Sequence, residues 1–451
     1  MKPLDFLVPL TFLLCAAPPG LFAETPSLTL RQAIDRALGQ NPQAAIARAG
    51  EKDAKAASGL ARTALLPQLS FTEDISRGND PVYVFGSRLR QQQFTQADFA
   101  LNSLNRPQPI GNFASRVSGS WLAFDSLKTE KDIRRADLFR QSAASASKAV
   151  DQALVFQVVR AYQAVLYAQR RVDVAQHEQQ TAEALLAQAD DHVKAGLAVE
   201  SDRMAANVNL AARKQESIAA QGDLDLAWAD LREAMGDGDL QPAPLRPIEP
   251  HVFPTSTLGD ELALALKSRP DLLALGDAGK AQSEAVSAAR ADFGPRVSAY
   301  GNWEEDRGSF IGSGGNNWVA GVQIDLDILP LGKRDQLARE NAACRRVSAE
   351  ASQARSQIRL DVSRAHIQLQ TAGLSLQTAR QALDQSSESL RIVKNRYNSG
   401  LATITDLLRA EDAEREIQSN YWGAVYANAV AYAQLLHAEG ALTPDAAEEL
   451  Q

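Results

Sequence analysis

Cysteine, histidine and long hydrophobic runs are all scarce in this chain of 451 residues. Its two cysteines are Cys15 and Cys344, and its five histidines lie far apart in the sequence. No stretch after the N-terminus is apolar enough to form a membrane helix, which needs about 20 such residues. These absences disfavour a disulfide scaffold, a histidine metal centre and a helical membrane anchor.

The chain also has no excess of basic residues. It contains 47 Lys and Arg residues and 55 Asp and Glu residues, which give a formal net charge of −8. A nucleic-acid binder normally carries a basic face, so that function is disfavoured. His177-Glu178 lacks the second histidine of a zinc-protease helix. No Gly-x-Ser-x-Gly elbow occurs at a strand-to-helix turn. The sequence therefore predicts no enzyme, no cofactor and no metal.

The first 23 residues have the pattern of a secretory signal peptide. Lys2 supplies positive charge, residues 6–17 are apolar, and Ala23 is a plausible cleavage position. Cys15 leaves open the alternative of a lipoprotein, although the residue before it is larger than usual for a lipidation site. Export without a later membrane helix leaves the periplasm, the outer membrane or the exterior as locations.

Internal similarity divides the rest of the chain into two halves. Residues 28–71 resemble residues 256–299, with matched prolines such as Pro42 and Pro270 lying 228 positions apart. Further along, the matched residues are 204 positions apart: Gly196 and Gly400, Asp202 and Asp406, and Gly236 and Gly440. Two constant separations over such lengths indicate two internal repeats.

Each half has the same predicted order of two short helices, two strands, a very long helix and a long helix. Residues 130–194 contain no proline or glycine, and residues 333–397 contain only Gly373. Helices of this length span about 100 Å, and one alone could not bury enough apolar surface to be stable. They are expected to pack side by side, as helices do in coiled coils.

The strands are predicted by an alternation of apolar and polar residues with a period of two. On the last strand, one face carries Trp318, Ala320, Val322, Ile324, Leu326 and Ile328. Each strand is about ten residues long, which is enough to cross a bilayer at a tilt. Trp121, Trp303 and Trp318 are candidates for an aromatic girdle at the membrane interface. A soluble sandwich with one wetted face is the alternative.

The number of strands has a consequence for assembly. Four strands cannot close a barrel, and hydrocarbon does not tolerate an open sheet edge. Membrane barrels need about eight strands or more, so the strands of two or three chains would have to be pooled. The sequence thus predicts a mainly α protein with a membrane β part, assembled into an oligomeric conduit.

The order of several short motifs resembles the TolC-like outer-membrane efflux family, over most of the chain between residues 27 and 440. The motifs are Leu30-Arg31-Gln32-Ala33-Ile34-Asp35-Arg36-Ala37 followed by Asn41-Pro42, Leu65-Leu66-Pro67-Gln68-Leu69, Gly196-Leu197 leading to Ser201-Asp202, Arg396-Tyr397-Asn398-Ser399-Gly400-Leu401, and Thr405-Asp406-Leu407-Leu408. The resemblance implies a homotrimer with a twelve-stranded outer-membrane β-barrel, four strands per chain, and a long periplasmic α-helical barrel. It implies no catalysis.

The resemblance further implies a passive exit duct of a tripartite efflux or secretion system, in the outer membrane of a Gram-negative bacterium. Its partners would be a periplasmic adaptor (membrane-fusion) protein, an inner-membrane pump of RND or ABC type, and outer-membrane lipid. The expected segments are a signal peptide (1–23), N-terminal periplasmic helices (24–66), a first membrane strand pair with a long outer loop (67–127), a first helical hairpin (128–235), an equatorial linker (236–257), helices of the second repeat (258–294), a second strand pair (295–330), a second hairpin (331–440) and a C-terminal tail (441–451).

A gate at the periplasmic helix tips is also implied by the resemblance, with Gly196 and Gly400 in the hairpin turns. At matching positions, Tyr397 would bond Asp202 in the neighbouring hairpin, with Ser201 nearby. These side chains would hold the closed state.

Asp406 matches a position where the family places an acidic ring in the constriction. Where family members can have a second acidic residue one turn later, this chain has Arg409. Asp406 and Arg409 are spaced to pair on one helix face, which would make the gate less negative. Alternatively, Asp406 only caps the helix that follows the turn.

The extra residues of the first half, about 77–111, are expected to form a barrel loop on the outer side. Such a loop would plug or cover the pore mouth, contact a neighbouring barrel, or serve as a mere connection. Two other functions compete with the conduit: a periplasmic adaptor and a structural coiled-coil envelope protein. A cell-wall enzyme is third and has no residue constellation in its support.

Overall fold

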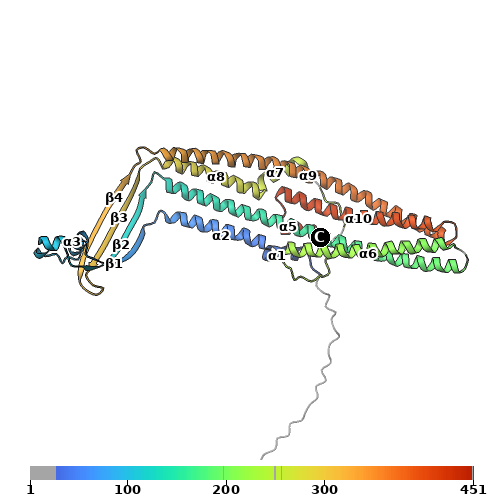
Figure 1. The fold of residues 1–451 in the computed structure, drawn as a ribbon. Coiled ribbons are helices and arrows are strands. Elements are labelled where there is room, and N and C mark those ends of the chain that lie inside the picture. The colour runs from blue at the N-terminus through green and yellow to red at the C-terminus, as the bar shows by residue number, and fades with distance from the viewer. Residues whose placement is uncertain (1–26, 197, 248–249, 255, 449, 451) are drawn as a thin grey trace, which may run out of the picture.

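The protein is elongated, with a β-sheet at one end and paired long helices running away from it (Figure 1). The computed structural model describes residues 27–196, 198–247, 250–254, 256–448 and 450. The predicted signal peptide, with Cys15 and the alternative of lipidation, lies outside these residues. The predicted fold class is confirmed at the level of one chain, which is mainly helical with one four-stranded antiparallel sheet.

The two halves contain the same order of main elements. The first half comprises α1 (Leu30–Gln40), α2 (Pro42–Thr63), β1 (Gln68–Gly78), β2 (Ile110–Phe124), α5 (Lys128–Lys194) and α6 (Glu200–Met235). The second half comprises α7 (Leu258–Ser268), α8 (Pro270–Ala291), β3 (Arg296–Arg307), β4 (Gly314–Asp325), α9 (Leu331–Asn398) and α10 (Ile404–Glu439). A short helix, α11 (Pro444–Glu448), follows.

Local sequence explains the helix boundaries. Asn41 ends α1 and caps α2, because its Oδ1 accepts a hydrogen bond of 2.8 Å from the N–H of Gln43. Pro42 then occupies the first position of α2, where no N–H is needed. Pro67 lies between α2 and β1, and Pro295 lies between α8 and β3, so neither helix can run on into its strand.

The long helices pack side by side, as expected. Near the sheet, α5 lies between α2 and α8, and α8 packs against α9. Farther away, the α5–α6 hairpin and the α9–α10 hairpin lie together, with α10 against α5 (Figure 1). Helix α5 has 67 residues and therefore spans about 100 Å.

The main hydrophobic core lies where the chain start, the linker between the halves and the long helices meet. Tyr162 on α5 is fully buried there, and its hydroxyl donates to the carbonyls of Leu28 (2.8 Å) and Arg246 (3.1 Å). Leu28 also forms a parallel bridge with Leu245. The linker is therefore tied to the first residues of the first half.

The sheet has the order β1-β2-β3-β4, so β1 and β4 are its two edges. Residues that lie opposite each other form rows across it, and one row on one face consists of Phe71, Val117, Trp303 and Trp318. Trp121 lies nearer the helices, where its indole N–H donates to the carbonyl of Leu65 at 3.0 Å. This face is apolar and open, with Trp318 76% exposed.

The predicted alternation was wrong at the end of the last strand. β4 ends at Asp325, which pairs with Arg296, the first residue of β3. Leu326 and Ile328 come after this pair and are exposed outside the strand. The reason is that Pro295 precedes Arg296 and cannot donate a further ladder hydrogen bond.

The segment between β1 and β2 is more than the loop that the sequence suggested. This β1–β2 insertion, residues 79–109, contains α3 (Pro81–Arg90), a 3₁₀ turn η1 (Gln96–Phe99) and α4 (Leu101–Asn105). Its small apolar centre is made by Phe94, whose ring meets those of Phe85 and Phe99 edge to face at 4.7 and 5.2 Å. The insertion therefore contains short helices and a small apolar cluster.

Candidate periplasmic gate and hairpin contacts

Both long hairpins turn at a glycine in the left-handed conformation. Gly196 has φ +69° and Gly400 has φ +72°, values that favour glycine because it has no Cβ. After α9, the N–H of Gly400 bonds the carbonyl of Tyr397 (3.0 Å) and the N–H of Leu401 bonds that of Arg396 (2.8 Å). This pattern is the Schellman motif, which satisfies the last carbonyls of a helix. Leu197, in the other turn, lies outside the described residues.

The two hairpin tips contact each other within one chain. A small buried cluster contains Ala189 of α5, Ala206 of α6 and Ile404 of α10, with the ring of Tyr397 packed against it. Tyr397 is thereby half-buried at the end of α9. The cluster holds the tips together by apolar contact, independently of any polar link.

Tyr397 and Asp202 lie close enough to interact electrostatically. Burial raises the pKa of Tyr397, and the negative charge of Asp202 raises it further. Within the described part of one chain, no hydrogen bond joins these two side chains. Ser201 is exposed in the first turn of α6, beside Asp202. Within one chain the structure thus places Asp202 near Tyr397 without a hydrogen bond between them, and the latch stays a prediction.

Asp406 forms a capping box with Thr403 at the start of α10. The N–H of Asp406 donates to Thr403 Oγ1 (3.2 Å), while Asp406 Oδ2 accepts from the N–H (3.0 Å) and the hydroxyl (2.7 Å) of Thr403. These bonds from Thr403, followed by the charges of Arg409 and Arg396, lower the pKa of Asp406. Both Asp406 and Arg409 are exposed, and no ion pair joins them in the described chain.

A ring of two arginines and two carboxylates joins the hairpins farther from the tips. Arg213 on α6 donates to Asp412 on α10 (2.6 Å) and to Glu216 on its own helix (2.6 Å). Arg415 on α10 donates to Glu216 (2.8 Å) and lies 3.5 Å from Asp412. Sequence reasoning missed this ring, because its partners lie 199 positions apart and no motif marks them.

Two further carboxyl groups in the same region have raised pKa values. Burial and the nearby charge of Glu178 raise the pKa of Glu411 on α10 to about 7. Burial also raises the pKa of Glu178 on α5, and the charge of Glu414 adds to this effect. The contact zone between the hairpins therefore combines an ion-pair ring with two carboxyl groups whose pKa values are raised.

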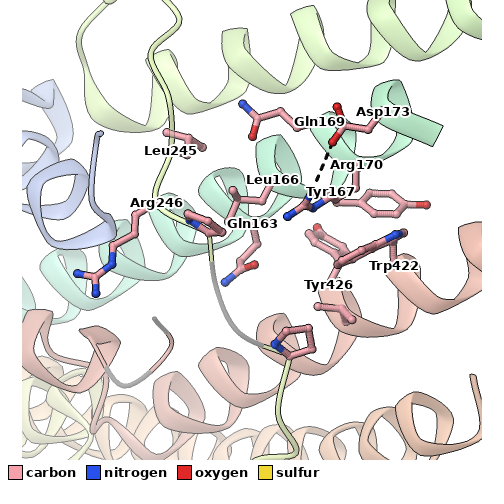
Figure 2. Close-up of a pocket in the computed structure, with 13 residues that line it drawn as sticks. Gln163, Leu166, Tyr167, Gln169, Arg170, Asp173, Leu245, Arg246, Trp422 and Tyr426 are labelled. Atoms are coloured by element: carbon pink, nitrogen blue, oxygen red, sulfur yellow. Dashed lines mark hydrogen bonds and ion pairs between the residues drawn. The ribbon is translucent and has the colours of Figure 1, made fainter. Parts of the chain in front are cut away.

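Aromatic contacts join the same helices nearer the middle of the molecule. A cavity of about 750 Å³ lies between α5, α10 and the linker. Figure 2 shows Tyr167, Arg170, Trp422 and Tyr426 along it. The Arg170 guanidinium lies 5.0 Å from the centre of the Trp422 ring, and the rings of Tyr167 and Tyr426 stack at 5.6 Å. These are cation–π and stacking contacts between α5 and α10.

Among the described residues, no three His, Cys, Asp or Glu side chains are grouped to hold a metal ion. In the same part of the chain, no helix is both long and apolar enough to span a membrane. The described cysteine, Cys344, is free and half-buried on α9.

Comparison with known proteins identifies the class of protein. The sequence profile of the outer membrane efflux protein family matches residues 33–237 and 262–441. The chain therefore belongs to this family, which confirms the resemblance inferred from its motifs. It is an outer-membrane efflux channel with a large periplasmic part, an exit duct of a tripartite system, and not an enzyme. The adaptor, the structural coiled coil and the cell-wall enzyme no longer compete with this function.

Individual relatives are distant in sequence but similar in fold. The alkaline protease secretion protein AprF of Pseudomonas aeruginosa is 22% identical over 430 residues, covering 92% of this chain and 85% of AprF. A membrane protein from Pseudomonas aeruginosa has a similar crystal structure, with a TM-score of 0.78, 20% identity, and coverage of 91% of this chain and 93% of that one. The CusC channel matches with a TM-score of 0.77, 17% identity, and coverage of 94% and 95%.

Proposed function

We propose that three copies of this chain form one duct, in which their sheets join into a twelve-stranded barrel and their long helices continue it as a periplasmic α-helical barrel. One observation carries this proposal. The sheet has two unpaired edges, β1 and β4, and one of its faces exposes Phe71, Trp318 and Val322. An open edge next to hydrocarbon would leave backbone groups without hydrogen bonds, so β4 of one copy must pair with β1 of the next.

The need for a passage favours three copies over two. Two copies would supply eight strands, and the interior of an eight-stranded barrel is filled by side chains. Three copies supply twelve strands, which leave a bore. The apolar face then meets lipid, and the polar face, with residues such as Ser70, Ser118 and Asn302, lines water. Trp121, Trp303 and Trp318 would form the interfacial aromatic girdle.

Two structural repeats would give the trimer its near-sixfold helical ring. Matching glycines at the ends of α6 and α10 make matching contacts: a Cβ on Gly236 would lie 2.6 Å from Cα of Asn41, and one on Gly440 would lie 2.8 Å from Cα of Arg269. Asn41 and Arg269 precede the first prolines of α2 and α8. The same close approach of backbones therefore supports the repeat seen in the sequence.

The gate is proposed at the hairpin tips. Tyr397, Asp202 and Ser201 would form polar links that hold the tips inward, and three copies of Asp406 would surround the constriction, with Arg409 reducing their negative charge. The ring of Arg213, Glu216, Asp412 and Arg415 fixes the two hairpins of one copy to each other. The ring would then oppose any separation of the two hairpins of one copy during opening.

The partners follow from this arrangement. Members of the family work with adaptors and inner-membrane pumps in tripartite systems. For this chain we infer a periplasmic adaptor at the helical barrel and a pump of RND or ABC type that supplies the energy, because the family to which the chain belongs consists of channels. Outer-membrane lipid surrounds the strands.

Protein extracted from outer membranes tests the assembly. Native mass spectrometry should give the mass of three mature chains, and heating in detergent should convert this species to single chains. The same preparation should form ion channels in a planar bilayer. A single-chain mass from a preparation that still conducts would contradict the shared barrel.

A further inference from the structure

The β1–β2 insertion, residues 79–109, lies across the polar face of the sheet. On β1, the hydroxyl of Ser76 is 3.0 Å from that of Tyr83. On β2, Asn112 receives a hydrogen bond from Gln91 at 2.9 Å. On β4, a Cβ on Gly315 would lie 2.1 Å from the carbonyl oxygen of Arg90. The register places Ser76, Asn112 and Gly315 on the face opposite the exposed tryptophans.

The end of α3 is fixed to this face by buried and partly buried polar contacts. Arg90 donates to Glu304 Oε1 (3.2 Å), and Arg116 donates to the other oxygen of Glu304 (2.7 Å). Gln91 donates to the carbonyl of Gly111 as well as to Asn112, and Asn112 in turn donates to Asp306 (2.7 Å).

The acceptors of this network are shielded from solvent. Glu304 is 7% exposed and Asp306 is 0% exposed. Buried hydrogen bonds to carboxylates are stronger than exposed ones, because water does not compete for them. The contacts therefore form a built seat for the insertion, and we call the residues Arg90, Gln91, Asn112 and Glu304 the plug seat.

If the polar face lines the bore, the insertion lies inside it. We propose that residues 79–109 form a plug in the outer mouth of the duct, one from each copy, and that the plug seat sets the largest cargo that can leave. This inference rests on the proposed shared barrel. The apolar side chains that the insertion turns away from its own centre, Val82 and Leu101, are 80% and 76% exposed. They would line the remaining passage with apolar surface, and an apolar constriction resists wetting.

The counterpart between β3 and β4 offers a contrast. Residues 308–313 are few and contain no helix. Only the first half therefore builds a plug. This gives a role to the residues of the β1–β2 insertion that the second half lacks. Three plugs related by symmetry would leave gaps whose size depends on how firmly each is seated.

Labelling from outside the cell tests the plug without depending on the periplasmic gate. Ser120 lies on the polar face of β2, opposite Tyr300, and eight residues from Asn112, or about 27 Å toward the helices. Ser120→Cys in a Cys344→Ser background would be exposed to a small impermeant maleimide and to a maleimide on a bulky polyethylene glycol. The two reagents are added separately to intact cells.

The small reagent should label Ser120→Cys in every variant, and the bulky one only slowly in the parent. Arg90→Ala with Gln91→Ala should speed bulky labelling by about tenfold or more, because the seat is lost. Replacing residues 82–106 with a short Gly-Ser linker should do the same. Arg106→Ala is the matched control, since it removes an exposed charge of the same insertion that has no contact with the sheet among the described hydrogen bonds and ion pairs.

The two possible failures are distinguishable. Equal bulky labelling in the parent, the seat variant and the linker variant, with small-reagent labelling intact, would overturn the plug and leave the barrel standing. No labelling by the small reagent in any variant would show that the polar face does not line water. In that case both the shared barrel and the plug would fall.

Discussion

Arg213 on α6 and Asp412 on α10 are joined by a hydrogen bond of 2.6 Å between Nη2 and Oδ1. The two residues are 199 positions apart in the chain, and Glu216 and Arg415 complete a closed ring with them. The side chain of Arg213 is only 11% exposed, whereas the side chains of Asp412 and Glu216 are 53% and 39% exposed. This ring is the polar contact that fixes one hairpin to the other.

Removing the ring should loosen the hairpins of each copy. Arg213→Ala should lower the free energy of unfolding by about 1.5–3 kcal/mol, the usual worth of hydrogen bonds to charged groups. The melting temperature of the detergent-solubilised protein would fall accordingly, and single channels should open more often. Arg346→Ala is the control, because the Arg346–Glu350 pair is exposed and lies along one helix; it should cost less than about 1 kcal/mol. Equal effects of the two substitutions would contradict a special role for the ring.

The two roles considered for Asp406 can be separated. Thr403→Ala breaks the capping box but keeps the carboxylate, whereas Asp406→Asn removes the charge and keeps an oxygen that can cap. Thr403→Ala should cost about 1 kcal/mol of stability, and Asp406→Asn should leave the fold intact. If Asp406 lines the constriction, Asp406→Asn should reduce cation selectivity and block by divalent ions, and Thr403→Ala should not. Unchanged selectivity in Asp406→Asn would leave capping as the function of this residue.

The stability of the protein should fall as the pH rises from about 4.5 to about 7. The folded-state pKa of Glu411 is about 7, above the ordinary value, because burial and Glu178 disfavour its charged form. The charges of Lys394 and Arg213 lower this pKa, and the charge of Asp412 raises it. A raised carboxyl pKa contributes stability that is complete below the unfolded pKa of about 4.5 and is lost as the pH passes through the folded value.

The measurement is the melting temperature between pH 5 and pH 8. Glu411→Gln should flatten part of the decline over this range. The pKa of Glu439 is also raised to about 7, by burial and the charge of Glu261, so Glu411→Gln with Glu439→Gln should flatten it further. A decline of the same slope in the double variant as in the parent would show that these carboxylates are charged in the folded protein.

The orientation of the sheet predicts opposite outcomes at two adjacent residues. Val322 is 66% exposed on the apolar face, and Gln323 lies on the polar face, where it bonds Asp325 at 2.8 Å. Val322→Arg should impair assembly in the membrane, since an arginine facing lipid costs up to about 2–4 kcal/mol. Gln323→Arg should assemble normally. The yield of heat-modifiable oligomer measures both, and equal yields would argue against a lipid-facing Val322.

Much of the fold follows from patterns with a clear period. The alternation around Trp318 predicts β4, because the two faces of a strand meet different surroundings. The absence of proline and glycine in residues 130–194 predicts α5, because these two residues disfavour a helix interior. The matched glycines, Gly236 and Gly440, also predict equivalent helix ends. Their backbones approach Asn41 and Arg269 too closely for a Cβ, so glycine is required at both positions for the same steric reason.

The polar contacts were less predictable. The sequence offers an acidic ring or a helix cap as the role of Asp406, and the structure shows a capping box that depends on a hydroxyl three residues earlier. The ring around Arg213 joins side chains whose distance in the sequence carries no signal. The helices of the β1–β2 insertion were missed because they are short, and their stability comes from contacts with the sheet and from the Phe94 cluster.

The most direct test of the account is a cryo-electron microscopy map of the protein in a lipid nanodisc. We expect threefold symmetry, with twelve strands around a water-filled bore, β4 of each copy paired with β1 of the next, and the long helices continuing the wall. A map of a single chain whose sheet edges are covered by its own helices, with no bore shared between copies, would contradict it.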